Sequence, residues 1–127
     1  MDELIISGTI KTPEIHFDYQ SGKLVFQGRS IPEDAIAFYT PILDWIKGYI
    51  NHPQSTTRIE VKLEYFNTSS SKCILDILKL LESIHENGTT ITVYWHFEED
   101  DEDMQEAGED YQAIVHLPFK MIEVEEF

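Results

Sequence analysis

Three short runs near the start of the chain are rich in apolar residues, and in the second of them Ile15 and Phe17 alternate with His16 and Asp18. This period of two is typical of strands that bury one face. We therefore expect strands at residues 4–9, 14–19 and 23–27. The second and third flank Gln20-Ser21-Gly22, a sequence that favours a tight turn. The opening of the chain thus predicts an antiparallel meander.

The next apolar residues recur at helical spacing. Ser30 and Glu33 form a capping-box pattern that predicts the start of a helix. Pro41 lies inside the apolar run and predicts a kink or a break, because proline removes a donor and crowds the preceding turn. The expected apolar stripe comprises Ile36, Phe38, Tyr39, Ile42, Leu43, Ile46, Tyr49 and Ile50.

Strands and helices alternate in the second half of the chain. We expect strands at residues 57–66, 90–97 and 119–124, a helix near residues 69–87 that Gly88 ends, and a short helix at residues 111–115. A meander followed by this alternation predicts an α/β (α+β) fold. We expect a single domain over residues 1–127, with a mixed sheet of about five to six strands and helices packed against it.

Four hydroxyl residues stand where the long helix should begin. The sequence there is Asn67-Thr68-Ser69-Ser70-Ser71-Lys72, directly after an alternating strand. Asn67, Thr68 or Ser69 is expected to be the N-cap, beside free backbone N–H groups and the positive end of the helix dipole. A hydroxyl group at this place can cap the helix, which is common, or carry a phosphate, which that end of a helix tolerates well. The pattern alone leaves both roles open.

The charge of the chain narrows the choice of partners. Its 24 acidic and 9 basic residues give a net charge of −15, which argues against nucleic acid and against anionic membranes and favours protein partners with basic patches. Met1-Asp2-Glu3 has neither the basic region nor the apolar run of a signal peptide, and no stretch is long and apolar enough to span a membrane. The single cysteine, Cys73, fits a reducing cytoplasm and is interpreted as a packing residue.

The most acidic segment is Glu98–Asp110, in which nine of thirteen residues are acidic. It is interpreted as a solvated loop, an exposed helix, or a docking surface for a basic partner. Its spacing does not fit an EF-hand calcium loop. The segment follows the strand after the hydroxyl cluster and is expected at the same edge of the sheet. The candidate docking residues are Glu99, Asp100, Asp101 and Asp103.

Signs of catalysis are weak throughout the chain. The five histidines are scattered singly, and His96 is interpreted as a strand residue. No glycine-rich phosphate loop and no serine nucleophile motif is present. We therefore expect no enzyme activity, no cofactor and no metal, although a small enzyme or metal protein that uses the acidic segment stays open as an alternative.

Four segments of the chain carry a resemblance to known proteins. They are Leu63–Lys72, Gly8–Glu14, Gly28–Asp34 with Phe38–Pro41, and Trp95–Met104 with Gly108–Asp110. Together they resemble the SiaC family of bacterial regulatory phosphoproteins. The resemblance covers nearly the whole chain, with departures at Ile31 and Asp34, where tyrosine and asparagine are more typical.

The resemblance implies a signalling switch that has no catalytic activity of its own. A serine/threonine kinase would phosphorylate Thr68, a PP2C-type phosphatase would reverse this, and the unphosphorylated form would bind and activate a diguanylate cyclase. The resulting cyclic-di-GMP would favour aggregation or biofilm growth. Ser69 and Ser70 are the fallback phosphosites. The expected neighbours of the phosphate are Asn67, Ser69, Ser70, Ser71 and Lys72.

A second interpretation comes from the placement of the hydroxyl cluster. A phosphorylatable hydroxyl at a helix start after a central strand is also found in the STAS-like anti-sigma-factor antagonists, which are small αβ domains. This analogy at the level of the fold implies a STAS-like protein that controls transcription by partner switching. The two interpretations differ in the partner that the protein binds.

Overall fold

Six strands form one sheet whose spatial order follows the chain order, β1 to β6. The computed structural model describes residues 1–127. The strands are β1 Leu4–Ile6, β2 Glu14–Asp18, β3 Lys23–Ser30, β4 Thr56–Phe66, β5 Thr90–Glu98 and β6 Phe119–Val124. The helices are α1 Ala35–Tyr49, α2 Thr68–His85 and α3 Glu102–Ile114.

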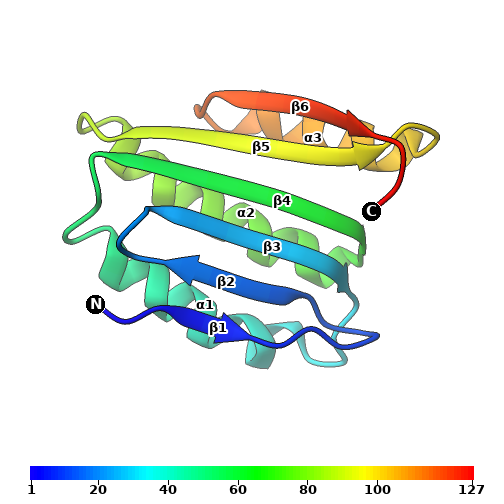
Figure 1. Cartoon of the computed structure of the whole chain (residues 1–127), viewed down its shortest axis with the longest axis horizontal. Helices are drawn as coiled ribbons and strands as arrows, with labels where there is room; N and C mark the ends of the chain where they lie inside the picture. Colours follow the sequence, from blue (N-terminus) through cyan, green and yellow to red (C-terminus); the bar gives the residue numbers. More distant parts are fainter.

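The sheet is antiparallel at its start and parallel afterwards. Strands β1, β2 and β3 pair antiparallel, and the pairs β3–β4, β4–β5 and β5–β6 are parallel, each joined through one helix. Such crossovers are almost always right-handed, so steps in one direction along the sheet put every helix on the same face. Figure 1 shows all three helices behind the sheet. The predicted mixed α/β fold is confirmed.

This topology gathers the starts of the three helices at one end of the sheet, where the parallel strands finish. Helices α1, α2 and α3 begin after β3, β4 and β5 end, on the right of Figure 1. The side chains between the sheet and the helices are mostly apolar, and Trp95, Tyr39 and Tyr49 are among the largest fully buried ones. The core therefore holds the helix starts in a fixed arrangement at the end of the sheet where the parallel strands finish.

The start of α1 differs from the predicted capping box. Ser30 is the last residue of β3, where it pairs with Phe66, and its side chain is fully buried. The N-cap is Asp34, whose side chain accepts a hydrogen bond of 3.1 Å from the backbone N–H of Ala37. The capping-box interpretation was wrong because pairing with β4 extends β3 through Ser30.

Helix α1 runs without interruption through Pro41, so the predicted break does not occur. Pro41 and Ala37 both lie on the exposed side of the helix. The Ala37 carbonyl that loses its donor can therefore bind water.

Two other boundaries differ from the expected ones. Strand β1 ends at Ile6, because the hydroxyl of Thr9 accepts bonds from the backbone N–H groups of Lys11 and Thr12 and turns the chain. Helix α3 has 13 residues and takes in most of the acidic segment, where a short helix was expected. Its buried Met104 and Tyr111 lie seven positions apart, on one face of the helix.

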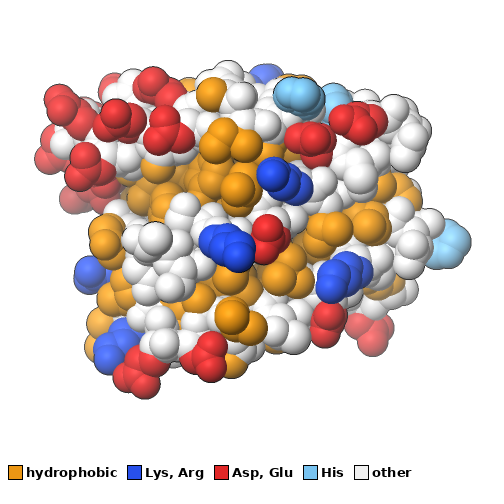
Figure 2. All heavy atoms as spheres, turned by 180° about the vertical axis from the view of Figure 1, so that it is seen from behind, with side chains coloured by type: hydrophobic (Ala, Val, Ile, Leu, Met, Phe, Trp, Pro, Cys, Tyr) orange, Lys and Arg blue, Asp and Glu red, His pale blue; other side chains and the backbone are white.

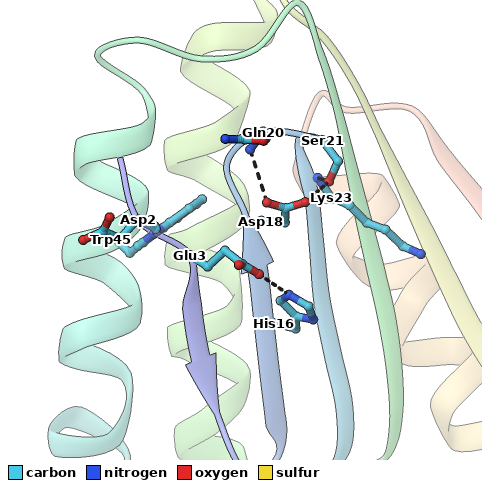
Figure 3. Close-up of polar contacts among 8 residues, drawn as sticks. All are labelled: Asp2, Glu3, His16, Asp18, Gln20, Ser21, Lys23 and Trp45. Atoms are coloured by element: carbon cyan, nitrogen blue, oxygen red, sulfur yellow. Dashed lines mark hydrogen bonds and ion pairs between the residues drawn. The ribbon is translucent and has the colours of Figure 1, made fainter.

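The short edge strand β1 is held by polar contacts of its flanking residues (Figure 3). The indole N–H of Trp45 in α1 donates to the carbonyl oxygen of Asp2 at 2.8 Å. On the other face, Nε2 of His16 in β2 lies 2.7 Å from a carboxylate oxygen of Glu3. Both contacts fix the segment that leads into β1.

None of the three helices has the length and hydropathy that crossing a bilayer requires.

Candidate functional site

Helix α2 begins at the end of the central strand β4. Asn67 is the N-cap, and its side-chain oxygen accepts a bond of 2.9 Å from the Ser70 N–H. Thr68 and Ser69 are the first two helical residues, so their own N–H groups have no partner within the helix. Of the three residues predicted as possible caps, Asn67 fills that role. The Thr68 hydroxyl is therefore free of it.

A buried hydroxyl network fixes this helix start to its neighbours. Tyr39 of α1 donates to Ser30 Oγ at 2.7 Å, Ser30 donates to Ser70 Oγ at 2.8 Å, and Ser70 donates back to the Ser30 carbonyl oxygen at 3.1 Å. Burial raises the pKa of Tyr39 to about 12, although the hydrogen bond with Ser30 opposes the shift. The phenol therefore stays a donor at neutral pH. Sequence patterns did not reveal this network.

The hydroxyl cluster divides into an inner and an outer pair. Ser70 is fully buried, and Ser71 is half-buried against Tyr111, whose hydroxyl donates to the Ser71 carbonyl oxygen at 2.8 Å. Thr68 and Ser69 are exposed, and neither hydroxyl is hydrogen-bonded within the protein. Thr68 and Ser69 are thus the two most accessible hydroxyl residues of the cluster.

A groove of about 750 Å³ lies between the first halves of α1 and α2, beside the outer pair. Cys73 and Tyr39 line it together with residues of both helices, and burial raises the pKa of the Cys73 thiol, which agrees with a packing role. The lining residues are Glu33, Asp34, Ala35, Ile36, Tyr39, Thr40, Leu43, Thr68, Ser69, Lys72, Cys73 and Asp76.

Ile36 departs from the predicted apolar stripe. It is 77% exposed at the groove, whereas the buried positions of α1 follow Ala35, Tyr39, Ile42 and Ile46. A large apolar side chain beside a groove is a feature of binding surfaces rather than of cores. Helical spacing alone could not separate Ile36 from its buried neighbours.

The charged groups of the groove are mostly acidic. Glu33, Asp34 and Asp76 contribute carboxylates, whereas Lys72 is the one cation and forms no ion pair. Lys72 lies one helical turn after Thr68. The groove therefore suits a partner that offers apolar and basic side chains, and it carries one lysine next to the exposed threonine.

The predicted docking residues of the acidic segment lie around the start of α3. Glu99 and Asp100 are exposed in the turn after β5, and Asp103 is exposed in the first turn of α3. Asp101 is half-buried and caps α3 by accepting a bond of 3.0 Å from the Met104 N–H. Figure 2 shows acidic side chains gathered at one upper corner of the helix face.

The acidic helix flanks the start of α2 on the side away from the groove. Asp110 and Tyr111 of α3 line a smaller hollow of about 260 Å³ together with Phe66, Ser71 and Leu75. The expectation that the segment shares an edge of the sheet with Thr68 agrees with this placement. A phosphate on Thr68 would join a region that already carries negative charge.

A separate polar cluster lies on the sheet face that carries no helix. The carboxylate of Glu60 in β4 is only 5% exposed, and it is ion-paired with Arg58 and hydrogen-bonded to His96 Nε2 at 2.8 Å. The guanidinium of Arg58 also lies 4.0 Å from the centre of the Tyr94 ring. His96 is thus a strand residue whose ring supports a buried carboxylate.

We expect Glu60 to stabilise the fold in a pH-dependent way. Burial alone would raise its pKa, but the hydrogen bonds from Arg58 and His96 outweigh burial and lower the pKa below 4.5. A carboxyl whose pKa is depressed in the folded state stabilises above the unfolded pKa, and this contribution is lost as the pH falls through the folded value. Glu60→Gln should lower the free energy of unfolding by roughly 1–3 kcal/mol at neutral pH. Urea denaturation should show the difference shrinking below about pH 4. An equal difference at neutral and acidic pH would contradict this account.

Known proteins match the chain over nearly its whole length. The family model described as SiaC family regulatory phosphoprotein matches residues 6–124. An uncharacterized protein of Pseudomonas aeruginosa strain UCBPP-PA14 is 35% identical over 119 residues, which are 94% of each chain.

Solved structures from Pseudomonas aeruginosa share the fold. A crystal structure of the diguanylate cyclase SiaD in complex with its activator SiaC matches with a TM-score of 0.90 and 34% identity, covering 95% of this chain and 99% of the matched one. A structure of SiaC matches with a TM-score of 0.89 and 32% identity, covering 98% and 100%. The residues 6–124 that the family model matches include both walls of the groove and the hydroxyl cluster.

Proposed function

Since the chain belongs to the SiaC family of regulatory phosphoproteins, we propose that it is a non-enzymatic signalling switch that activates a diguanylate cyclase in its unphosphorylated form. Phosphorylation of Thr68 by a serine/threonine kinase would block this activation, and a PP2C-type phosphatase would restore it. The observation that carries the proposal is the exposed, unbonded Thr68 hydroxyl at the rim of a groove. The cyclase is proposed because SiaC is the activator of SiaD in a matching complex.

The accessible hydroxyls limit where a kinase can act. Thr68 and Ser69 are exposed on the first turn of α2, whereas Ser70 could reach a kinase only if the helix start opened. We keep Thr68 as the proposed phosphosite and Ser69 as the fallback. Asn67 holds the helix start in place without using either hydroxyl.

The switch needs no large conformational change. A phosphate on Thr68 would add about −1.5 to −2 charges beside the free N–H groups of the first turn and within reach of the unpaired Lys72. A partner seated in the groove would then bury this charge without a counter-ion of its own. Leaving a buried charge unpaired costs on the order of 2–5 kcal/mol. This cost would raise a Kd of about 1 μM to roughly 30 μM at its lower end and to a few millimolar at its upper end.

The acidic groups around the site supply the proposed specificity for the partner. A partner with basic side chains is favoured by Glu33, Asp34 and Asp76 at the groove. The exposed Asp103 of α3 favours the same kind of partner. We expect association to weaken as salt screens these charges. We also propose that the protein is cytoplasmic, since its single cysteine is unpaired. Residues 1–127 would form a single regulatory domain.

The proposal is tested by capturing partners from the native cytoplasm with the unphosphorylated protein as bait. Recovery of a diguanylate cyclase, followed by increased cyclic-di-GMP synthesis when the purified proteins are mixed, is the expected result. Recovery of a sigma-factor regulator in its place would favour the partner-switching control of transcription. A cyclase that binds without a change in its activity would contradict the activator role.

We predict that Ile36 is a contact residue for the partner. Its 77% exposed side chain would be covered on binding, and burying such a side chain contributes about 1.5–3 kcal/mol. Ile36→Gln should therefore weaken binding of the cyclase by roughly 10- to 100-fold in isothermal titration calorimetry. The matched control is Ile5→Gln, since Ile5 is 63% exposed on β1, away from the groove. Equal losses in both variants would place the docking surface elsewhere.

A further inference from the structure

The end of α2 far from the hydroxyl cluster carries a second group of functional side chains. Glu82 and Glu86 lie one helical turn apart, and His116 joins them from the connection between α3 and β6. One ligand atom from each residue lies within 4.8 Å of the other two. Figure 2 shows histidine and acidic side chains side by side along the upper edge of the helix face, at the end opposite the acidic corner.

The electrostatics of this group are unfavourable without a cation. Two carboxylates one turn apart repel each other, and both lie near the C-terminal end of α2, where the helix dipole disfavours negative charge. No lysine or arginine forms an ion pair with Glu82 or Glu86. A bound cation would relieve both the repulsion and the dipole term.

The local backbone places the imidazole at this position. The backbone N–H of His116 donates to a carboxylate oxygen of Glu82 at 2.7 Å. Val115 and Leu117 on either side are buried in the core, so the connection is fixed on both flanks of His116. Three groups remain available as ligands: the second oxygen of Glu82, the carboxylate of Glu86 and the imidazole of His116. Because the backbone of His116 is already fixed, ion binding would cost little additional conformational entropy.

We propose that Glu82, Glu86 and His116 form a surface site for a divalent transition-metal ion of the zinc class. Mixed carboxylate and imidazole donors suit Zn²⁺, whereas Mg²⁺ and Ca²⁺ prefer oxygen donors alone. Water would complete the coordination, since the three side chains are partly or fully exposed. The ion would join α2 to the segment that leads into the edge strand β6.

Titration calorimetry of the full chain with Zn²⁺, and separately with Mg²⁺, tests the proposal. The expected result is one Zn²⁺ per chain, bound at least tenfold more tightly than Mg²⁺, together with a rise in Tm of a few degrees in excess Zn²⁺. The informative pair is His116→Gln against His52→Gln, because His52 is exposed in the loop after α1 and belongs to no such group. Zn²⁺ binding should fall at least tenfold in the first variant and stay unchanged in the second.

A second pair of variants separates the site from general attraction to an acidic protein. Glu86→Gln should also lose Zn²⁺ binding, whereas Glu109→Gln, an exposed acid of α3, should keep it. Both changes leave the apo protein folded, which its Tm without metal checks. Equal losses in all variants, or binding of Zn²⁺ no tighter than that of Mg²⁺, would overturn the proposal and indicate diffuse counter-ion attraction.

Discussion

Gly108→Ala is expected to destabilise the protein by about 2–3 kcal/mol, although alanine is the better helix former. Gly108 lies in α3 where the helix touches β5, and an added β-carbon would lie 2.5 Å from Trp95 Cδ1 and 2.8 Å from Met121 Cε. Trp95 cannot move aside, since it is fully buried and its indole N–H donates to the Met104 carbonyl oxygen at 2.9 Å. Helix α3 must therefore shift away from the sheet. Urea denaturation at neutral pH measures the loss.

The matched control is the other helical glycine. A β-carbon at Gly48 in α1 would meet only the terminal methyl of Met1, at 2.9 Å, and Met1 is 54% exposed and free to move. Gly48→Ala should therefore stabilise the protein by roughly 0.5–1 kcal/mol. If Gly108→Ala were as stable as the wild type, close contact with Trp95 would not be what fixes α3.

The effect of Gly108→Ala should extend to the hydroxyl cluster. Tyr111 lies one turn further along α3 and donates to the Ser71 carbonyl oxygen, at the start of α2. A displaced α3 would break this bond and loosen one support of the helix start. The packing of α3 is therefore linked to the site of the proposed phosphate.

Local patterns predicted most of the fold because burial follows them closely. In β4, Ile59, Val61 and Leu63 are buried toward the helices, as the alternation over residues 59–65 indicated. Tyr65, the fourth apolar position of that alternation, was expected on the same face but is 52% exposed, because the pairing of β3 with β4 shifts register between Gly28 and Arg29. Helix α2 begins and ends within two residues of its expected bounds. The start of α1 was wrong because a tertiary interaction decided it. Pairing with β4 draws Ser30 into a strand, so the cap falls to Asp34.

The candidate site could be located from the sequence but not built from it. The run of hydroxyls marked the start of α2, yet only packing shows that Ser70 points inward to Ser30 and Thr68 outward to the groove. The second wall of the groove comes from α1, about 30 residues earlier in the chain. The same reason hid the group of Glu82, Glu86 and His116, since His116 is separated from Glu82 by 34 positions.

Phosphorylation of Thr68 is expected to produce the largest change in binding. The phosphorylated protein should bind the diguanylate cyclase at least roughly 30-fold more weakly than the unphosphorylated one. This lower limit corresponds to about 2 kcal/mol, the smallest cost expected for a buried charge without a partner. Thr68→Ala should bind within about threefold of the wild type, and kinase treatment should no longer weaken its binding. Calorimetric titrations of the cyclase with the treated and untreated proteins measure both effects.

The roles of the neighbouring residues provide the controls for this prediction. Ser69→Ala keeps Thr68 and should remain switchable, whereas loss of switching in Ser69→Ala alone would move the phosphosite to Ser69. Asn67→Ala removes the cap and should cost about 1 kcal/mol of folding stability, while Thr68→Ala should cost within about 0.5 kcal/mol because its hydroxyl makes no bond. Weak binding by a Thr68→Ala protein of unchanged stability would make the hydroxyl itself a contact with the cyclase. Binding that survives stoichiometric phosphorylation of Thr68 would remove the groove from the interface.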